Sequence, residues 1–232
     1  MSYEKSVNAG TSSNNEKFGD VFFLKEEKSS APAKAVAFFL RKNKEDLRVQ
    51  FINEKMKFVL PTMEYEVAAK EYVEEFIAHN SEINGTGGIL PFIERNDYAG
   101  YVKKILADMD IANVGAERVP ALTYFYVRER DNRIVGMVNI RLDENEFILK
   151  EAGHIGYCVR PTERRKHYAS QMLSDAIKVC RRVRIQKILV SCDKVNIASA
   201  NTIKSCGGIL EDEFYSEIFH EVLQRYAIPE AV

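Results

Sequence analysis

The stretch that decides the fold is Ile155-Gly156-Tyr157-Cys158-Val159-Arg160-Pro161-Thr162-Glu163-Arg164-Arg165-Lys166-His167-Tyr168-Ala169. It begins as a strand, expected at residues 154–159, and continues through a basic turn into a long amphipathic helix, expected at residues 163–182. The first amides of a helix have no partner inside it, and the helix dipole adds partial positive charge at the same end. Three consecutive basic side chains lie beside those amides, so the turn is suited to bind a pyrophosphate. A solvated basic helix start is the alternative that this composition also permits.

Apolar periodicity predicts further elements on both sides of this stretch. Before it, the pattern predicts a short strand, two helices and two strands, at residues 57–60, 65–77, 98–109, 121–127 and 134–142. A glycine-rich loop at residues 84–88 separates the two helices. After it, the pattern predicts a strand, a helix and two apolar strand segments, at residues 187–192, 198–205, 209–210 and 218–226. This order predicts a mixed α/β (α+β) domain whose central strands lie in one sheet flanked by helices.

The first 56 residues differ in character from the rest of the chain. Residues 1–15 are mostly Ser, Asn, Gly and Thr, the composition of a segment that cannot offset its own ordering entropy. Residues 18–58 alternate short apolar pieces with clusters of Lys and Glu, and these pieces could be strands of a small appended element. We therefore expect an N-terminal extension at residues 1–56, partly disordered, and one domain at residues 57–232.

Composition narrows the class of protein. Hydrophobic residues make up 46% of the chain and charged residues 29%, which is enough apolar side chain for a real core. The formal net charge is -1, so no whole-molecule field would draw nucleic acid or an anionic membrane to the protein. No apolar run approaches the ~20 residues that a membrane helix needs, and the N-terminal residues lack a signal-peptide pattern. The sequence predicts a cytoplasmic protein without nucleic-acid or membrane partners, and it leaves a homodimer open.

The four cysteines give no sign of metal or redox chemistry. Cys158, Cys180, Cys192 and Cys206 are far apart and form no C-x-x-C pair. They are expected to be small buried hydrophobic residues in a reducing compartment, and no metal site is predicted. Cys158 has no recognisable His partner in the sequence, so a covalent route through its thiol is not expected.

The quoted stretch resembles the acetyl-CoA signature of the GNAT superfamily, in which Arg or Gln is followed by two residues, Gly, one residue, and Gly or Ala. Arg164 and Ala169 match this pattern, and His167 occupies the place of the first glycine. A second block of the family is also in register, with a strand ending at Asp193 and a Gly207-Gly208 pair after a short helix. The resemblance covers residues 57–232 and implies the GNAT fold, with a mixed, mostly antiparallel central sheet flanked by helices.

The resemblance also implies an activity. A GNAT protein of this kind is an N-acetyltransferase that moves an acetyl group from acetyl-CoA to an amine of a small molecule or peptide, by direct transfer and without a metal. The alternative is a non-catalytic module that binds CoA or a partner protein. His167 and Ile203 motivate this alternative, because many GNAT enzymes carry glycine at the first position and tyrosine at the second.

By resemblance, the backbone of Tyr157, Cys158 and Val159 pairs with the pantetheine arm of the cofactor, and Asn196 and Ser199 reach the same arm. The amides of one continuous segment cradle the pyrophosphate: Arg164, Arg165, Lys166, His167, Tyr168, Ala169 and Ser170. The position of Asn196 also permits a helix N-cap. The side chain of His167 could crowd a phosphate that glycine would admit, unless helical dihedrals turn the imidazole outward.

Acetyl transfer to an amine needs a base that takes the amine proton and an acid that protonates the departing thiolate. His154 opens the strand that leads into the cofactor loop, where many GNAT enzymes place a base, and a hydrogen-bonded structural histidine is the alternative. Glu151 is the second candidate for the base, and Glu146 is a more distant one. Since Ile203 has no proton to give, the acid is expected to be one of two tyrosines or water. These tyrosines are Tyr215 and Tyr226.

Overall fold

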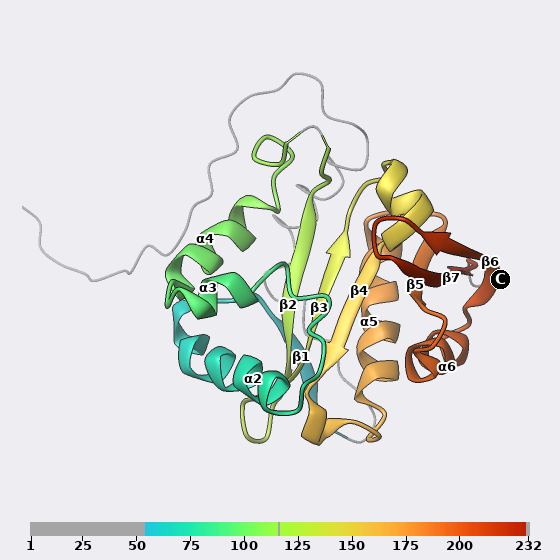
Figure 1. Cartoon of the computed structure of the whole chain (residues 1–232). Coiled ribbons are helices and arrows are strands. Elements are labelled where there is room, and N and C mark those ends of the chain that lie inside the picture. The colour runs from blue at the N-terminus through green and yellow to red at the C-terminus, as the bar shows by residue number, and fades with distance from the viewer. Residues whose placement is uncertain (1–53, 116, 231–232) are drawn as a thin grey trace, which may run out of the picture.

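A computed structural model describes residues 54–115 and 117–230 of the chain (Figure 1). The expected tail at residues 1–15, and all but the end of the segment at residues 18–58, lie outside the described residues. Met56 already belongs to the first strand and is buried. Glu54 forms an ion pair with Arg130 at 2.6 Å. The last residues of the expected extension therefore pack with the domain.

Four antiparallel strands form the first sheet, in the order β1-β2-β3-β4. Their bounds are Met56–Val59, Ala121–Arg128, Arg133–Arg141 and Ile155–Val159. Every residue of β2 is buried, because the strand lies between two neighbours and both of its faces are covered. Successive side chains alternate between the two faces, so Tyr124 and Tyr126 enter one core while Phe125 and Val127 enter the other.

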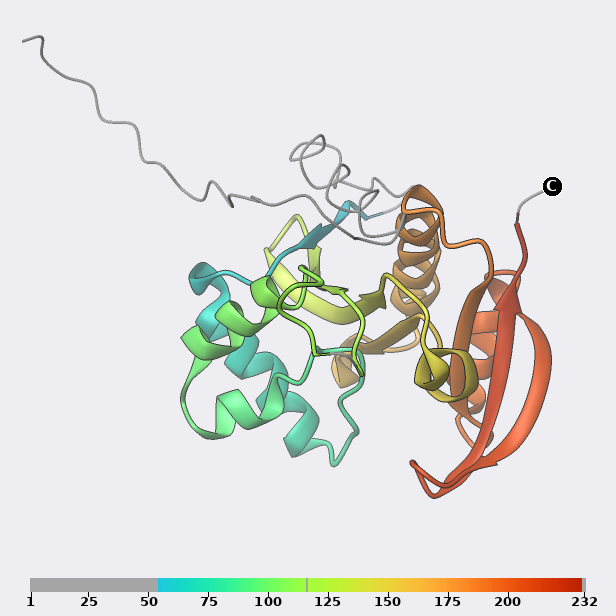
Figure 2. The ribbon, with the colours of Figure 1, turned by 90° about the horizontal axis from the view of Figure 1, so that it is seen from above.

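Helices cover both faces of this sheet (Figure 2). One face packs against α2 (Glu66–Ala78) and α4 (Tyr98–Ala107), which follow the short turn η1 (Met63–Tyr65), and α3 (Leu90–Glu94) lies between these helices in sequence. The opposite face packs against the apolar stripe of α5 (Tyr168–Arg182). This stripe recurs at three- and four-residue steps and includes Met172, Leu173, Ala176 and Cys180.

Three antiparallel strands form the second sheet, in the order β5-β7-β6. Their bounds are Ile188–Asp193, Glu221–Ile228 and Ile209–Ser216. The last strand of the described chain is therefore the middle strand of its sheet. Helix α6 (Ile197–Ser205) connects β5 to β6 and contributes Ala200 and Ile203 to the same core as α5.

A single β-bridge joins the two sheets in the described part of the chain. An isolated antiparallel bridge joins Gly153 to Val190, and no other β-bridge links β4 to β5 in the described part of the chain. Gly153 has a φ of 65°, which no extended strand residue adopts, so the ladder ends there. The predicted fold class, a mixed α/β domain with antiparallel strands flanked by helices, is confirmed. The single sheet expected from the sequence is instead two sheets that separate between β4 and β5.

Several local predictions differ from the structure. Helix α5 begins at Tyr168 and not at residue 163, because η3 (Pro161–Glu163) is a separate 3-10 turn and two left-handed residues follow it. Residues 148–152 form a π-helix, η2 (Ile148–Ala152), which was not predicted, and neither was α3. Residues 218–220 were expected in a strand, but they form the turn between β6 and β7.

Candidate active site

A cleft of about 360 Å³ lies where β4 and β5 separate. Its walls come from these two strands, from η2, from the loop after α2 and from the starts of α6 and β7. The deciding stretch contributes Ile155, Gly156 and Tyr157 to this lining. Most of the other lining residues are polar: Glu82, Asn84, Arg141, Glu151, Ser191, Asp193, Asn196, Ser199 and Glu221.

The cofactor loop, residues 160–167 between β4 and α5, has the backbone that a phosphate cradle needs. His167, the N-cap residue of α5, is left-handed with φ 66° and ψ 6°, and Arg165 has a φ of 62°. The first amide that donates a hydrogen bond inside the helix is that of Gln171, and it donates to the His167 carbonyl at 3.1 Å. The preceding amides of the first turn are those that a helix leaves without a partner. His167 is thus not helical, and it keeps the conformation that glycine most easily adopts at this position.

Side chains of the loop are largely engaged with the protein itself. Arg164 donates through Nε to the Val159 carbonyl at 3.0 Å and through a terminal nitrogen to Ser81 Oγ at 2.6 Å. Lys166 pairs with Glu163 at 2.9 Å. All four basic residues expected at the pyrophosphate are exposed, but Arg164 and Lys166 are already paired with other groups of the protein. The loop therefore offers a phosphate mainly its backbone amides, which fits the acetyl-CoA expectation at the level of the main chain.

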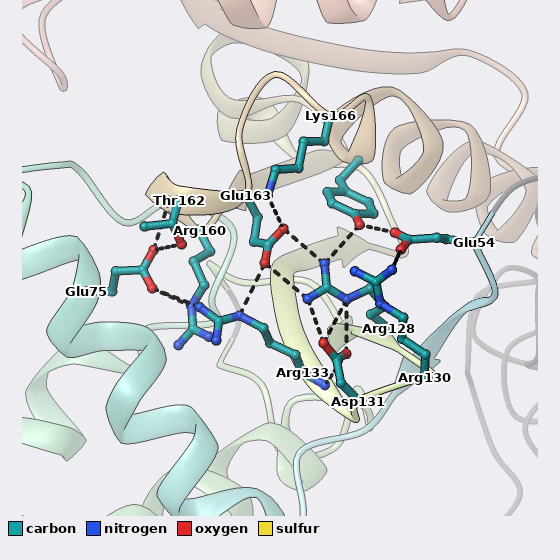
Figure 3. Close-up of polar contacts among 11 residues, drawn as sticks. Glu54, Glu75, Arg128, Arg130, Asp131, Arg133, Arg160, Thr162, Glu163 and Lys166 are labelled. Atoms are coloured by element: carbon teal, nitrogen blue, oxygen red, sulfur yellow. Dashed lines mark hydrogen bonds and ion pairs between the residues drawn. The ribbon is translucent and has the colours of Figure 1, made fainter.

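An ion network centred on the buried pair Arg128–Glu163 anchors this loop to the first sheet (Figure 3). We call it the Glu163 network, and its members are Arg128, Asp131, Arg133, Glu163 and Lys166. Arg128 contacts Glu163 at 3.0 Å and Asp131 at 2.7 Å, and the side chains of Arg128 and Glu163 are each only 7% exposed. Arg128 also donates to the hydroxyl of Tyr168, at 3.0 Å. The network fixes both ends of the loop, because Glu163 precedes it and Tyr168 follows it.

His154 lies at the point where the two sheets meet. It is fully buried, and its Nδ1 accepts a hydrogen bond from the Leu189 amide at 3.0 Å. Burial, helped by the charge of Arg141, lowers the pKa of His154 to about 4. Because Nδ1 already accepts, the neutral ring carries its proton on Nε2, which lies 3.8 Å from a Glu144 carboxylate oxygen. His154 is absent from the cleft lining, so the geometry favours the structural alternative over a catalytic base.

Glu151 is the predicted base that the structure brings to the cleft. It belongs to η2, and its Oε2 atom is buried without a hydrogen-bond partner among the described residues. Glu146 is exposed, pairs with Lys150 at 2.6 Å and lines a neighbouring pocket instead. Glu151 therefore has a free carboxylate oxygen beside the cleft, and Glu146 does not reach it.

The three residues predicted to pair with the pantetheine arm lie on β4 as expected. Tyr157 points towards α6, and its hydroxyl lies 3.2 Å from Ser199 Oγ. Cys158 faces the opposite core, where its Sγ lies 3.1 Å from the hydroxyl of Tyr72, and Val159 is buried. Burial raises the pKa of the Cys158 thiol to about 11, so the thiolate is scarce at neutral pH.

Asn196 and Ser199 lie together at the start of α6, and both line the cleft. The Asn196 side chain accepts a hydrogen bond from the Ser199 amide at 3.0 Å, which is an N-cap. The cap that the sequence permitted is therefore present. Both side chains still face the cleft from the first turn of this helix.

The two tyrosines predicted as proton donors are not at the cleft. Tyr215 is 55% exposed on the edge strand β6. Tyr226 is buried in the core, and its hydroxyl donates to Gln224 at 2.7 Å. Neither residue lines the cleft, because β7 presents Glu221 and Leu223 to it and its lining includes no residue of β6.

An acidic pair in the cleft was missed in the sequence. Asp193 ends β5 and Glu221 begins β7, and pairing of these strands brings the two carboxyl groups together. Hydrogen bonding to Asp193 raises the pKa of Glu221 to about 7. The only local sign of this pair in the sequence was the position of Asp193 at the end of a buried strand. Glu221 had none, because its place depends on a strand pairing between distant parts of the chain.

The sequence matches the acetyltransferase (GNAT) family over residues 94–207, a range that includes β4, the cofactor loop and α6. The chain contains a GNAT acetyltransferase domain. The predicted family and enzyme class are thereby confirmed. Comparison with curated protein sequences finds no significant match. In the described part of this GNAT protein, no helix is long and apolar enough to cross a membrane, and no group of three or more His, Cys, Asp or Glu residues could hold a metal.

Solved acetyltransferases share the fold of the GNAT protein at low sequence identity. The ribosomal-protein-S5-alanine acetyltransferase of Vibrio fischeri is 16% identical, with 78% of this chain and 97% of that chain covered and a TM-score of 0.57. The microcin C7 self-immunity acetyltransferase, in complex with acetyl-CoA and AMP, is 17% identical, with coverage of 78% and 96% and a TM-score of 0.56. The ribosomal L7/L12 alpha-N-protein acetyltransferase RimL, in complex with coenzyme A, is 16% identical, with coverage of 78% and 97% and a TM-score of 0.57.

Proposed function

We propose that this GNAT protein transfers an acetyl group from acetyl-CoA directly to an amine. The observation that carries the proposal is the polar cleft at the separation of β4 and β5, because β4 leads from this cleft into the loop whose first-turn amides have no partner inside the helix. A donor bound along β4 would have its pyrophosphate at the loop and its thioester at the cleft. The acceptor would enter the same cleft from the side of the loop after α2, which contributes Glu82, Asn84 and Gly85.

The backbone supplies most of the proposed donor site. The amides from Arg165 to Ser170 would bind the pyrophosphate, with the dipole of α5 adding to their attraction. The edge of β4 that faces away from β3 would pair with the pantetheine arm through Tyr157 and Val159. Asn196 and Ser199 would contact that arm from α6.

Glu151 is the residue we assign as the base. An amine must lose a proton to attack a carbonyl carbon, and a carboxylate within reach accepts it directly or through water. Glu151 has a buried carboxylate oxygen with no partner among the described residues, at the wall of the cleft. The protonation state of Glu221 changes near neutral pH, so it could share this task.

Charge favours a cationic acceptor. Arg141 is the one basic residue that lines the cleft. Four acidic side chains line it as well: Glu82, Glu151, Asp193 and Glu221. An amine that carries a second positive charge would be held by the carboxylates that do not take its proton. Polyamines, aminoglycoside-like amines and basic peptide N-termini share this chemistry.

The test is release of free thiol from acetyl-CoA with a panel of amines. The panel holds spermidine, an aminoglycoside, a basic peptide with a free N-terminus and the same peptide with the N-terminus blocked. We expect turnover with at least one cationic amine, and a loss of about 10²-fold or more in kcat for Glu151→Gln. Glu146→Gln is the matched control and should keep its activity. Binding of acetyl-CoA without turnover on any amine would instead support the non-catalytic module.

A further inference from the structure

The π-helix η2 carries Glu151, the residue assigned above as the base, and it lies between the two sheets (Figure 2). It has only five residues. A helix this short is not stable on its own, so contacts with the rest of the domain set its position. Asn145 caps its start, because Oδ1 of this residue accepts from the Ile148 amide at 2.9 Å. The last carbonyls of a helix have no partner inside it, so the end of η2 needs donors from elsewhere.

Two arginines supply those donors, one from each sheet. Arg141 ends β3, and its Nη1 donates to the Gly153 carbonyl at 2.9 Å. Arg225 lies on β7 and donates to the Lys150 carbonyl at 3.0 Å. Both carbonyls lie within two residues of Glu151 in the sequence, one before it and one after it. The arginines therefore hold the main chain on both sides of the proposed base.

Arg141 has only backbone partners. Its second, longer bond goes to the Ala152 carbonyl at 3.4 Å, and it forms no ion pair among the residues that the structure describes. Burial lowers the pKa of Arg141, because the charge loses water without gaining a carboxylate, although the guanidinium stays ionised. This charge is stabilised instead by the negative end of the η2 dipole. Arg141 and the end of η2 therefore stabilise each other.

The carboxylate of Glu151 depends on this support. Glu151 and Arg141 both line the cleft, so the proposed base and its anchor share one wall. Oε2 of Glu151 has no hydrogen-bond partner among the described residues, so no contact of that oxygen fixes the side chain. Its direction is then set by the main chain that carries it. A displacement of about 1 Å can cost a catalytic group about 10²-fold in rate.

We propose that Arg141 and Arg225 are positioning residues, which keep the Glu151 carboxylate at the cleft wall by holding the carbonyls of η2. The inference rests on the proposed function, in which Glu151 is the base. Neither arginine transfers a proton itself, since a guanidinium does not give up its proton in a protein. Their loss should therefore slow the chemical step and leave acetyl-CoA binding unchanged.

The first test is Arg141→Met, which removes the donors but keeps most of the apolar stem. We expect kcat with the fastest amine to fall by about 10- to 10²-fold, while the Kd for acetyl-CoA, measured by calorimetry, stays within about threefold. Arg141→Lys keeps a donor for the Gly153 carbonyl and should recover part of the lost kcat. Arg225→Met should also lower kcat. An unchanged kcat in Arg141→Met would overturn the inference.

The deciding test repeats Arg141→Met in the Glu151→Gln background. A residue that acts only through Glu151 then has no base left to position, so the additional loss in kcat should be less than about threefold. An equal loss in both backgrounds would show that Arg141 acts on the substrates directly, and it would overturn the positioning role while leaving acetyl transfer intact. If Glu151→Gln alone keeps its activity, the assignment of the base fails, and this inference fails with it.

Arg181→Met is the matched control. Arg181, on α5, also donates to main-chain carbonyls, those of Ile185 at 3.0 Å and Ile228 at 2.7 Å, and it does not line the cleft. Its kcat should stay within about threefold of the wild type. A loss equal to that of Arg141→Met would overturn the specific role of Arg141. Thermal unfolding shows which variants are folded, and if Arg141→Met is not, Arg141→Lys takes its place in both backgrounds.

Discussion

The main-chain amide of Leu189 on β5 donates a hydrogen bond to Nδ1 of His154, at 3.0 Å, and the His154 amide donates in return to the Leu189 carbonyl, at 2.6 Å. These two bonds flank the single bridge between the sheets. An imidazole nitrogen can accept from a backbone amide only while it is unprotonated. The junction between the sheets therefore depends on the charge state of one side chain.

Acid should weaken the fold through His154. Its pKa is about 4 in the folded protein, and a histidine in an unfolded chain has a pKa near 6.5. As the pH falls from about 6.5 to about 4, the unfolded state takes up a proton that the folded state refuses, so the free energy of unfolding decreases. The total effect is on the order of 3 kcal/mol, and above pH 6.5 this group adds no pH dependence.

Urea unfolding at pH 7.5, 6 and 5 measures this effect. His154→Asn is the matched variant, since its amide oxygen can still accept from Leu189 but does not titrate. The difference in stability between wild type and variant should shift in favour of the variant as the pH falls. Parallel pH curves for the two proteins would show that His154 does not carry the acid sensitivity.

Gly85 should tolerate no side chain. It has a φ of 65°, and a Cβ at this position would lie 2.1 Å from the Gly156 carbonyl oxygen on β4. Gly85→Ala must displace either the loop after α2 or the strand, so we expect a loss of at least about 2 kcal/mol in the free energy of unfolding and a higher KM for the amine. Gly88→Ala is the control, because Gly88 also has positive φ but no atom within 4 Å of its Cβ position. Its cost should be only about 1 to 2 kcal/mol. Equal costs in the two variants would argue against close packing at Gly85.

His167→Gly should preserve the cofactor loop. The left-handed backbone of His167 costs about 1 to 2 kcal/mol for a residue with a Cβ, and glycine removes this cost but gains freedom in the unfolded chain. We expect a net change in stability within about 1 kcal/mol and acetyl-CoA binding at least as tight as in the wild type, measured by calorimetry. His167→Val should be clearly less stable, because β-branched residues resist positive φ. Weaker binding in the glycine variant would show that the imidazole itself contacts the cofactor.

Glu163→Gln should weaken the attachment of the cofactor loop to the first sheet. The Glu163 carboxylate holds Arg128 and Lys166, and Arg133 lies 3.3 Å from it, so its loss leaves the buried Arg128 with Asp131 as its remaining ion-pair partner among the described residues. We expect a loss of about 3 kcal/mol in stability and weaker acetyl-CoA binding. Glu66→Gln, which breaks only the helix-surface pair with Lys70, should cost less than about 0.5 kcal/mol. Unchanged acetyl-CoA affinity in Glu163→Gln would separate the network from the binding loop.

Local patterns in the sequence predicted most of the fold. Alternation along β2 and β3 and the apolar stripe of α5 are set by neighbours a few residues apart, and the structure contains all three elements. The start of α5 was misplaced because the residues at 163–167 have helix-compatible side chains. Arg165 and His167 adopt left-handed conformations, which a sequence indicates only where the residue is glycine.

The candidate site was harder to predict, because its members depend on long-range pairing. Glu151 and Tyr157 lie in or beside the deciding stretch and were named from it. Asp193 and Glu221 meet only because β5 pairs with β7. Lys166 is basic and well placed in sequence, yet its ammonium group pairs with Glu163, whose place under the loop depends on Arg128 of β2.

The order of strands in the second sheet has a consequence for how the protein is made. Because β7 lies between β5 and β6, neither of those strands has a partner in its sheet until β7 has been synthesised. A nascent chain that has reached only the turn before Glu221 would hold the cofactor loop but lack one wall of the cleft. Pairing between such distant segments is slow compared with helix formation. The cleft should therefore be the last part of the domain to mature, and premature termination in β7 should leave a chain with two exposed strand edges that is prone to aggregate.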